Sequence, residues 1–122
     1  MKLSELELEV LQQIWSRETA TAPDVHAALA ESRELSYSAV KTIFDRLERK
    51  GAIRRESQVG RTIVYTATVV KDRLRRTLVR EFLARVFPHG DRRPLFNALI
   101  RDAELSPEEV QYLRDLLNEH VK

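Results

Sequence analysis

A group of polar and basic residues between positions 36 and 50 has the types and the spacing to bind a polyanion. Six residues recur three and four positions apart and share one face of a helix at 100° per residue: Ser38, Lys41, Thr42, Asp45, Arg46 and Arg49. Lysine and threonine can contact base edges in the major groove of DNA, and arginine suits phosphate. A charged helix face is more often simply solvated, so the surrounding elements must decide between the two interpretations.

The segment that carries this face has the features of a buried helix with defined ends. Val40, Ile43, Phe44 and Leu47 predict its apolar side, and the helix is expected to run from Ser36 to Lys50 and to end at Gly51. Two strands are predicted next, over 52–57 and 62–66, joined around 58–61. The hairpin is basic, with Arg54, Arg55 and Arg61.

Two more helices are predicted upstream. The first has a capping box of Ser4 and Glu7 and an apolar stripe of Leu3, Leu6, Val10, Leu11, Ile14 and Trp15. The second begins at Thr21, with Pro23 in its first turn and a buried pair of Val25 and Leu29. Three helices followed by a hairpin give the order of a winged helix-turn-helix domain, placed at residues 1–70. This context favours nucleic acid over a merely solvated face.

The rest of the chain, residues 71–122, is predicted to form three short amphipathic helices, so the fold class is mainly α with a small β-hairpin. A break is expected at 88–91, and a second capping box at Ser106 and Glu109. Such short helices enclose little apolar surface and need a partner, either the winged-helix domain of the same chain or a second copy. We favour the copy, because a symmetric dimer binds two half-sites. The expected dimer residues are Leu74, Leu78, Phe82, Val110, Leu113 and Leu117.

The composition and the charge distribution exclude further classes of protein. The net charge is +2, and residues 33–65 carry eight basic against four acidic side chains. The longest uncharged run has nine residues, too few to span a bilayer. There is no cysteine and no secretion signal at the N-terminus, which predicts a cytoplasmic protein.

The sequence contains no set of residues with the types and spacing of an enzyme active site. His26, His89 and His120 lie far apart, and the three glycines cannot build a phosphate-binding loop. No catalytic residues, metal or cofactor are therefore expected.

Several segments together resemble the BlaI/MecI penicillinase-repressor family. They are Leu6 and Glu9 to Leu11 with Ile14 and Trp15, the run from Tyr37 to Gly51, Gly60 and Arg61 with Tyr65, and Leu105 to Glu109. The resemblance implies a homodimeric transcriptional repressor that occupies a palindromic operator on double-stranded DNA, of β-lactam-resistance or related stress genes. It also implies that the C-terminal helices form the dimer.

The resemblance also assigns roles to residues. Ser38, Ala39, Lys41 and Thr42 match positions that face base edges, while Arg46, Arg54, Arg61 and Tyr65 suit phosphate contacts, although Tyr65 is expected to belong more to the core than to the contact surface. Members linked to β-lactam resistance are released by a sensor peptidase that cuts between Asn and Phe. The corresponding bond joins Ala98 to Leu99, which departs from that pair.

One alternative remains open. A winged-helix domain can serve as a protein-interaction adaptor without specific DNA binding, since fold does not fix function. Asp45 and Glu48, two negative charges near the polar face, favour that alternative.

Overall fold

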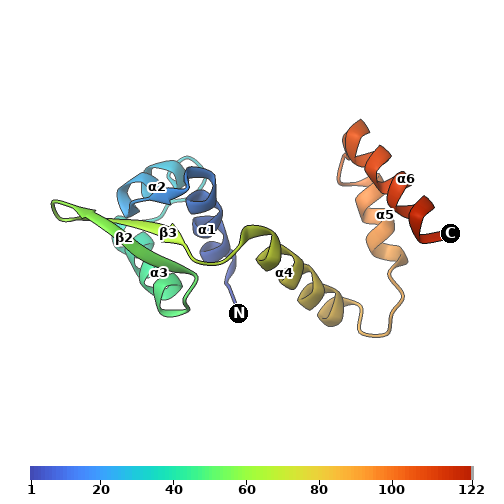
Figure 1. Ribbon diagram of the computed structural model, residues 1–122, viewed down its shortest axis with the longest axis horizontal. Coiled ribbons are helices and arrows are strands. Elements are labelled where there is room, and N and C mark those ends of the chain that lie inside the picture. The colour runs from blue at the N-terminus through green and yellow to red at the C-terminus, as the bar shows by residue number, and fades with distance from the viewer. Residues whose placement is uncertain (122) are drawn as a thin grey trace. The chain divides into compact units, whose positions relative to one another are not determined.

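The computed structural model describes residues 1–121 and contains the predicted elements in the predicted order (Figure 1). They are α1 (Glu5–Arg17), β1 (Thr19–Ala20), α2 (Ala22–Leu29), α3 (Tyr37–Arg49), β2 (Ile53–Val59), β3 (Thr62–Ala67), α4 (Lys71–Val86), α5 (Arg93–Arg101) and α6 (Pro107–Val121). The chain divides into two compact units, Met1–Leu78 and Val79–Lys122.

The helix starts are set by the residues that the sequence indicated. The Ser4 hydroxyl accepts from the Glu7 N–H at 3.1 Å, and the Glu7 carboxylate accepts from the Ser4 N–H at 2.9 Å, which completes a capping box. The hydroxyl of Thr21 accepts from the Asp24 N–H at the start of α2, and that of Ser36 accepts from the Ala39 N–H at the start of α3. Each cap satisfies a backbone donor that the first turn of a helix leaves free.

The hairpin is part of a three-stranded antiparallel sheet in the order β1-β3-β2. Sequence analysis missed β1, whose two residues pair Thr19 with Thr66 and Ala20 with Tyr65. A strand of two residues is too short to show an alternating pattern. The hairpin strands are longer than expected, 53–59 and 62–67, with an irregularity between Arg55 and Ser57. The extra strand anchors the base of the hairpin to the end of α1.

One apolar core lies beneath these elements in the N-terminal unit. The predicted buried faces of α1, α2 and α3 all contribute to it, and its largest fully buried side chains are Phe44, Leu11, Ile14, Leu47, Ile53, Val10, Val25 and Val40. Leu74 at the start of α4 is buried in the same core, and Leu78 packs against it. The winged helix-turn-helix is therefore complete only with the first turns of α4.

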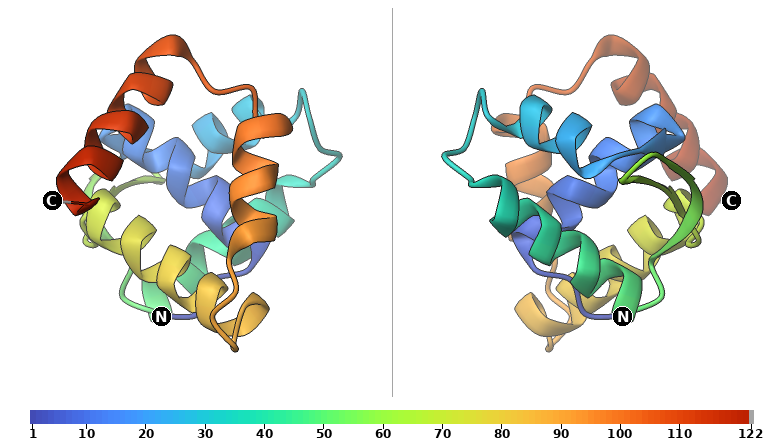
Figure 2. Two further views of the ribbon diagram at one scale, coloured as in Figure 1. Left: turned by 90° about the vertical axis from the view of Figure 1, so that its right-hand side faces the viewer. Right: turned by 90° about the vertical axis from the view of Figure 1, so that its left-hand side faces the viewer.

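The C-terminal unit, by contrast, leaves its apolar residues open to solvent. Helices α5 and α6 contain no buried residue, and their ribbons diverge from the loop that joins them (Figure 2). Large exposed hydrophobic residues between α4 and α6 include Phe82, Phe96, Leu99, Ile100, Tyr112, Leu116 and Leu117. This unit has the amphipathic helices that the sequence predicted but no core of its own.

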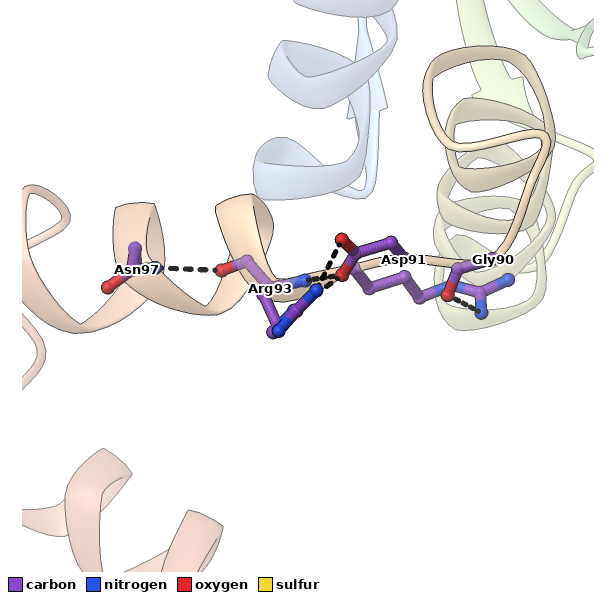
Figure 3. Close-up of polar contacts among 5 residues, drawn as sticks. Gly90, Asp91, Arg93 and Asn97 are labelled. Atoms are coloured by element: carbon purple, nitrogen blue, oxygen red, sulfur yellow. Dashed lines mark hydrogen bonds and ion pairs between the residues drawn. The ribbon is translucent and has the colours of Figure 1, made fainter.

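A polar turn fixes the start of α5 (Figure 3). The Asp91 carboxylate accepts from the Arg93 backbone N–H at 3.2 Å and from its guanidinium at 2.9 and 3.0 Å. These bonds, chiefly those of the guanidinium, lower the pKa of Asp91. Gly90, with φ +88°, takes the left-handed conformation that the turn needs. The helix break expected at 88–91 is confirmed. Across residues 1–121, no helix is both long and apolar enough to cross a membrane.

Candidate nucleic-acid interface

Helix α3 presents its polar face to solvent, as the sequence predicted. Six residues of this face are exposed: Ser38, Lys41, Thr42, Asp45, Arg46 and Arg49. Ala39 is half-buried at one margin. The opposite side of the helix packs into the core through Phe44 and Leu47. An α-helix with side chains is about 10–12 Å wide, which matches a major groove about 12 Å wide.

The hydroxyl groups at the start of this face already take part in local hydrogen bonds. Thr42 donates to the Ser38 carbonyl at 3.0 Å, and the hydroxyls of Ser36 and Ser38 lie 3.2 Å apart. Because the Thr42 proton is used within the helix, this side chain offers an outside partner its oxygen as an acceptor and its methyl group as an apolar contact. Both suit base edges, an exocyclic amino group in one case and a thymine methyl in the other.

The C-terminal end of α3 is tied to α1 by an ion pair that sequence analysis did not find. The Lys50 ammonium lies 2.8 Å from each oxygen of Glu7 and donates to the Lys2 carbonyl at 2.7 Å. Glu7 is only 3% exposed. Burial raises the pKa of Glu7, but the bonds from Lys50 and Ser4 outweigh it, so the net pKa is lowered. A glutamate in a capping box gives no sequence signal of a second partner 43 residues away.

The N-terminal end of α3 is held by the loop that precedes it. His26 donates from Nε2 to the Leu35 carbonyl at 2.8 Å, and its ring meets that of Tyr37 edge-on at 6.0 Å. Arg33 in the same loop pairs with Glu9 of α1 at 2.6 Å. The polar face of α3 is thus presented from a helix that is fixed at both ends.

The basic residues of the hairpin divide into two kinds. Arg55 pairs with Glu48 of α3 at 2.9 Å, and this hydrogen bond raises the pKa of Arg55. Arg54 and Arg61 are exposed and have no ion-pair partner among residues 1–121. Arg55 therefore fixes the hairpin against α3, whereas Arg54 and Arg61 are free to bind an anion.

Tyr65, suggested as a phosphate contact, lies mostly in the core. It is 3% exposed and its ring packs on Phe44 with centroids 5.0 Å apart. Burial raises the pKa of its phenol, which therefore stays protonated at neutral pH. It also lines a small hollow beside α3, of about 30 Å³, together with Tyr37, Lys41 and Arg61.

The remaining predicted residues lie in α4 to α6. Phe82 and Leu117 are exposed, and Val110 and Leu113 are half-buried. Leu113 also lines an apolar groove of about 560 Å³ with Leu99, Leu105, Tyr112 and Leu116. Leu74 was expected in a dimer interface, but it lies in the core of the N-terminal unit. Ala98 and Leu99 are exposed but lie inside α5, so a protease would need that helix to open locally.

Metal-binding side chains do not cluster in the part of the chain that the structure describes. No group of three or more His, Asp or Glu side chains is placed to hold a metal ion there. The candidate interface instead offers hydrogen-bond donors, hydrogen-bond acceptors and positive charge on the exposed face of α3.

Comparison with known proteins places these features in a family. The family model described as "Penicillinase repressor" matches residues 3–119. The chain is 25% identical to the penicillinase repressor of Staphylococcus aureus over 122 residues, covering all of this chain and 95% of the relative. It is 32% identical to the transcriptional regulator BlaI of Mycobacterium tuberculosis over 120 residues, covering 97% of this chain and 84% of the relative.

A solved structure supports the same assignment for the N-terminal unit. The solution structure of monomeric Bacillus licheniformis BlaI in complex with the blaP half-operator matches with a TM-score of 0.51 and 29% identity. The match covers 59% of this chain and 87% of that one.

Proposed function

The chain belongs to the penicillinase repressor family of DNA-binding transcriptional repressors, and we propose that it acts as a homodimer that occupies a palindromic operator. One observation carries this proposal. The exposed polar face of α3 stands beside a hairpin whose Arg54 and Arg61 have no ion-pair partner in the described chain. Positive charge next to an uncovered helix face is the footprint of a duplex-binding surface.

The residues of this surface have different tasks. Ser38, Ala39 and Thr42 contact base edges, Ala39 through a thymine methyl. Asp45, at the centre of the face, accepts from a cytosine amino group. Arg46, Arg54 and Arg61 contact phosphates, which set the position of the helix without reading sequence.

The homodimer is formed by the C-terminal helices, so residues 1–70 serve DNA binding and residues 71–122 serve dimerisation. Support comes from the exposed apolar side chains of α4 to α6, which lack a core within their own unit. Isolated apolar residues on a surface are ordinary, but this many large ones on successive amphipathic helices without a core favour an interaction surface. Leu78, Phe82, Val110, Leu113 and Leu117 contribute to this interface.

Three further parts of the proposal rest on the family. The repressor acts in the cytoplasm, it carries out no catalysis, and its target genes belong to β-lactam resistance or a related stress response. The proposal also has a sensor peptidase as a partner, which cleaves the repressor at the bond between Ala98 and Leu99.

Selection of bound duplexes from a random pool tests the function, with the size of the bound species measured afterwards by sedimentation. We expect an enriched palindrome bound by two chains. A non-palindromic site bound by one chain would contradict the dimer, and no enrichment at about 50 mM salt would contradict DNA binding altogether.

The second candidate function is an adaptor that binds a protein through the α3 face. Asp45 favours it, as an exposed negative charge on that face. Glu48 supports it less than the sequence suggested, because the Glu48 carboxylate is paired with Arg55. A protein captured by the wild type but not by an Asp45→Lys variant, with no retention of duplex, would favour the adaptor.

A further inference from the structure

The hollow beside α3 joins three elements that are distant in the sequence. Its lining comes from the start of α2 (Ala22 and Pro23), the first turns of α3 (Tyr37 and Lys41) and the hairpin (Arg61 to Ile63 and Tyr65). Two cationic side chains and two phenols therefore surround one small depression. Neither Lys41 nor Arg61 has a carboxylate partner among residues 1–121.

The size of the hollow limits its ligand. The hollow has a volume of about 30 Å³, whereas sites for drug-sized ligands run to roughly 300 Å³ or more. The hollow can seat the oxygens of one tetrahedral anion but not a base or a metabolite. Lysine, arginine and neutral phenol are all hydrogen-bond donors, and together they match a phosphate.

The helix geometry places Lys41 away from the centre of the base-facing surface. At 100° per residue, Ser38, Thr42, Asp45 and Arg49 lie within about 60° of one another, while Lys41 lies at one margin and Arg46 at the other. Tyr37 precedes Lys41 by one turn and shares its margin. A helix that nearly fills the major groove turns its margins toward the two phosphate backbones that border the groove.

From this geometry we infer that the hollow is the seat of one backbone phosphate of the bound duplex, and that Lys41 holds this phosphate with Arg61 and Tyr37 and does not read a base. The inference rests on the proposed function, since it requires a bound duplex. It changes the role that the family resemblance suggested for Lys41, and it assigns a role to Tyr37, which sequence analysis did not single out. The edge-on contact with His26 and the bond from His26 to Leu35 keep the Tyr37 ring at the rim.

Salt dependence separates a phosphate contact from a base contact. Each phosphate neutralised on B-DNA adds about 0.9 to the slope of log K against log salt. The homodimer carries each substitution in both half-sites, so we expect Lys41→Gln and Arg61→Gln each to lower the slope by about 1.8. Between 50 and 200 mM salt the ratio of wild-type to Lys41→Gln affinity should then shrink about 12-fold. Lys71→Gln is the matched control, because it removes one exposed lysine charge from α4 outside the hollow and should leave the slope unchanged.

A duplex with single neutral methylphosphonate linkages, placed in turn along the selected site, locates the phosphate. We expect one linkage in each half-site at which neutralisation weakens the wild type roughly tenfold and weakens Lys41→Gln clearly less, because only Arg61 and Tyr37 still hold the phosphate in that variant. Tyr37→Phe should weaken binding about two- to tenfold at every base sequence, with the fold retained by circular dichroism.

Two results would overturn the inference while leaving the proposed function intact. One is a Lys41→Gln variant with the wild-type salt slope and a relaxed preference at one base pair. The other is a methylphosphonate scan of the wild type in which no single neutral linkage weakens binding, which would leave the hollow without a backbone phosphate. Failure of the proposed function is a distinct result, in which the wild type itself retains no duplex at low salt.

Discussion

The ion pair between Glu7 and Lys50 joins α1 to the C-terminal end of α3, and its two partners are unequally exposed. The Glu7 side chain is 4% exposed and the Lys50 side chain 36%. Replacing Lys50 by methionine leaves a buried carboxylate with the Ser4 bonds alone, whereas replacing Glu7 by glutamine leaves an ammonium that reaches water. We therefore expect Lys50→Met to destabilise the protein more than Glu7→Gln.

The expected loss of unfolding free energy depends on how exposed the two partners of the ion pair are. Removing one partner from a fully buried ion pair costs about 3–5 kcal/mol, and an exposed pair contributes about 0–1 kcal/mol. Because water reaches the Lys50 side but not the Glu7 side, we expect an intermediate loss of about 2 kcal/mol for Lys50→Met and about 1 kcal/mol for Glu7→Gln. The double variant should lose less than the sum, since removing both charges leaves no unpaired ion.

The pH dependence provides a second signature. The folded pKa of Glu7 is below its ordinary value of 4.5, so the pair stabilises the wild type above that pH and the contribution is lost as pH falls through the folded pKa. In Lys50→Met the main interaction that lowers the pKa is gone and burial raises it. The difference in unfolding free energy between wild type and Lys50→Met should therefore begin to shrink above pH 4.5, where Glu7 of the folded variant takes up its proton, and should keep shrinking until the pH falls below the lowered folded pKa of the wild type.

Urea denaturation followed by the fluorescence of Trp15, the one tryptophan, measures these free energies in the N-terminal unit. The control is Lys71→Met, which removes an exposed lysine of α4. If Lys50→Met were no less stable than this control at pH 7, or if its deficit were the same at pH 4 and pH 7, the assignment of a stabilising buried pair would be wrong.

Three other variants test the rest of the structure. Arg55→Gln should weaken duplex binding in a filter titration, because it leaves the Glu48 carboxylate unpaired beside the interface, and adding Glu48→Gln should restore binding; a double variant as weak as the single one would refute this. Leu117→Asp should sediment as a monomer with weaker operator binding, since an unpaired carboxylate in an apolar interface costs several kcal/mol, while Asn118→Asp on the same helix stays dimeric. Ser36→Ala should lower the unfolding free energy by about 1 kcal/mol in urea denaturation, through loss of the α3 cap, and an unchanged midpoint would show that the cap does not stabilise α3.

The helices of this protein could be predicted from the sequence, because each helix start depends on a capping residue and a backbone group only a few positions apart. The caps at Ser4, Thr21 and Ser36 each act within three residues, so the sequence contains all that is needed to find them. The two-residue strand β1 was missed, since its pairing with β3 depends on residues 45 or more positions away. The core position of Leu74 was missed for a related reason, because an apolar stripe does not say which surface covers it.

For the same reason, the sequence predicted which residues form the candidate interface but not the contacts between their side chains. The pattern of α3 predicted which residues face solvent, and all six of them do. It did not predict that Arg55 is neutralised by Glu48, that the Thr42 proton is used by Ser38, or that Lys41 shares a hollow with Arg61. Each depends on side chains that come together only when the hairpin folds against the helix or the helix itself forms.

The arrangement of charges around α3 also explains how a surface with so many ionic groups can remain selective. Glu7, Glu9 and Glu48 each pair with a basic residue that supports the helix, namely Lys50, Arg33 and Arg55. These pairs fix the ends of α3 and the angle of the hairpin, and they contribute no net charge to the interface. The positive charge left over on α3 belongs to Lys41 and Arg46 at the margins of the face and to Arg49 near its C-terminal end. The rest of the face consists of short polar side chains and Asp45, which suit the edges of particular base pairs and are poorly suited to phosphate.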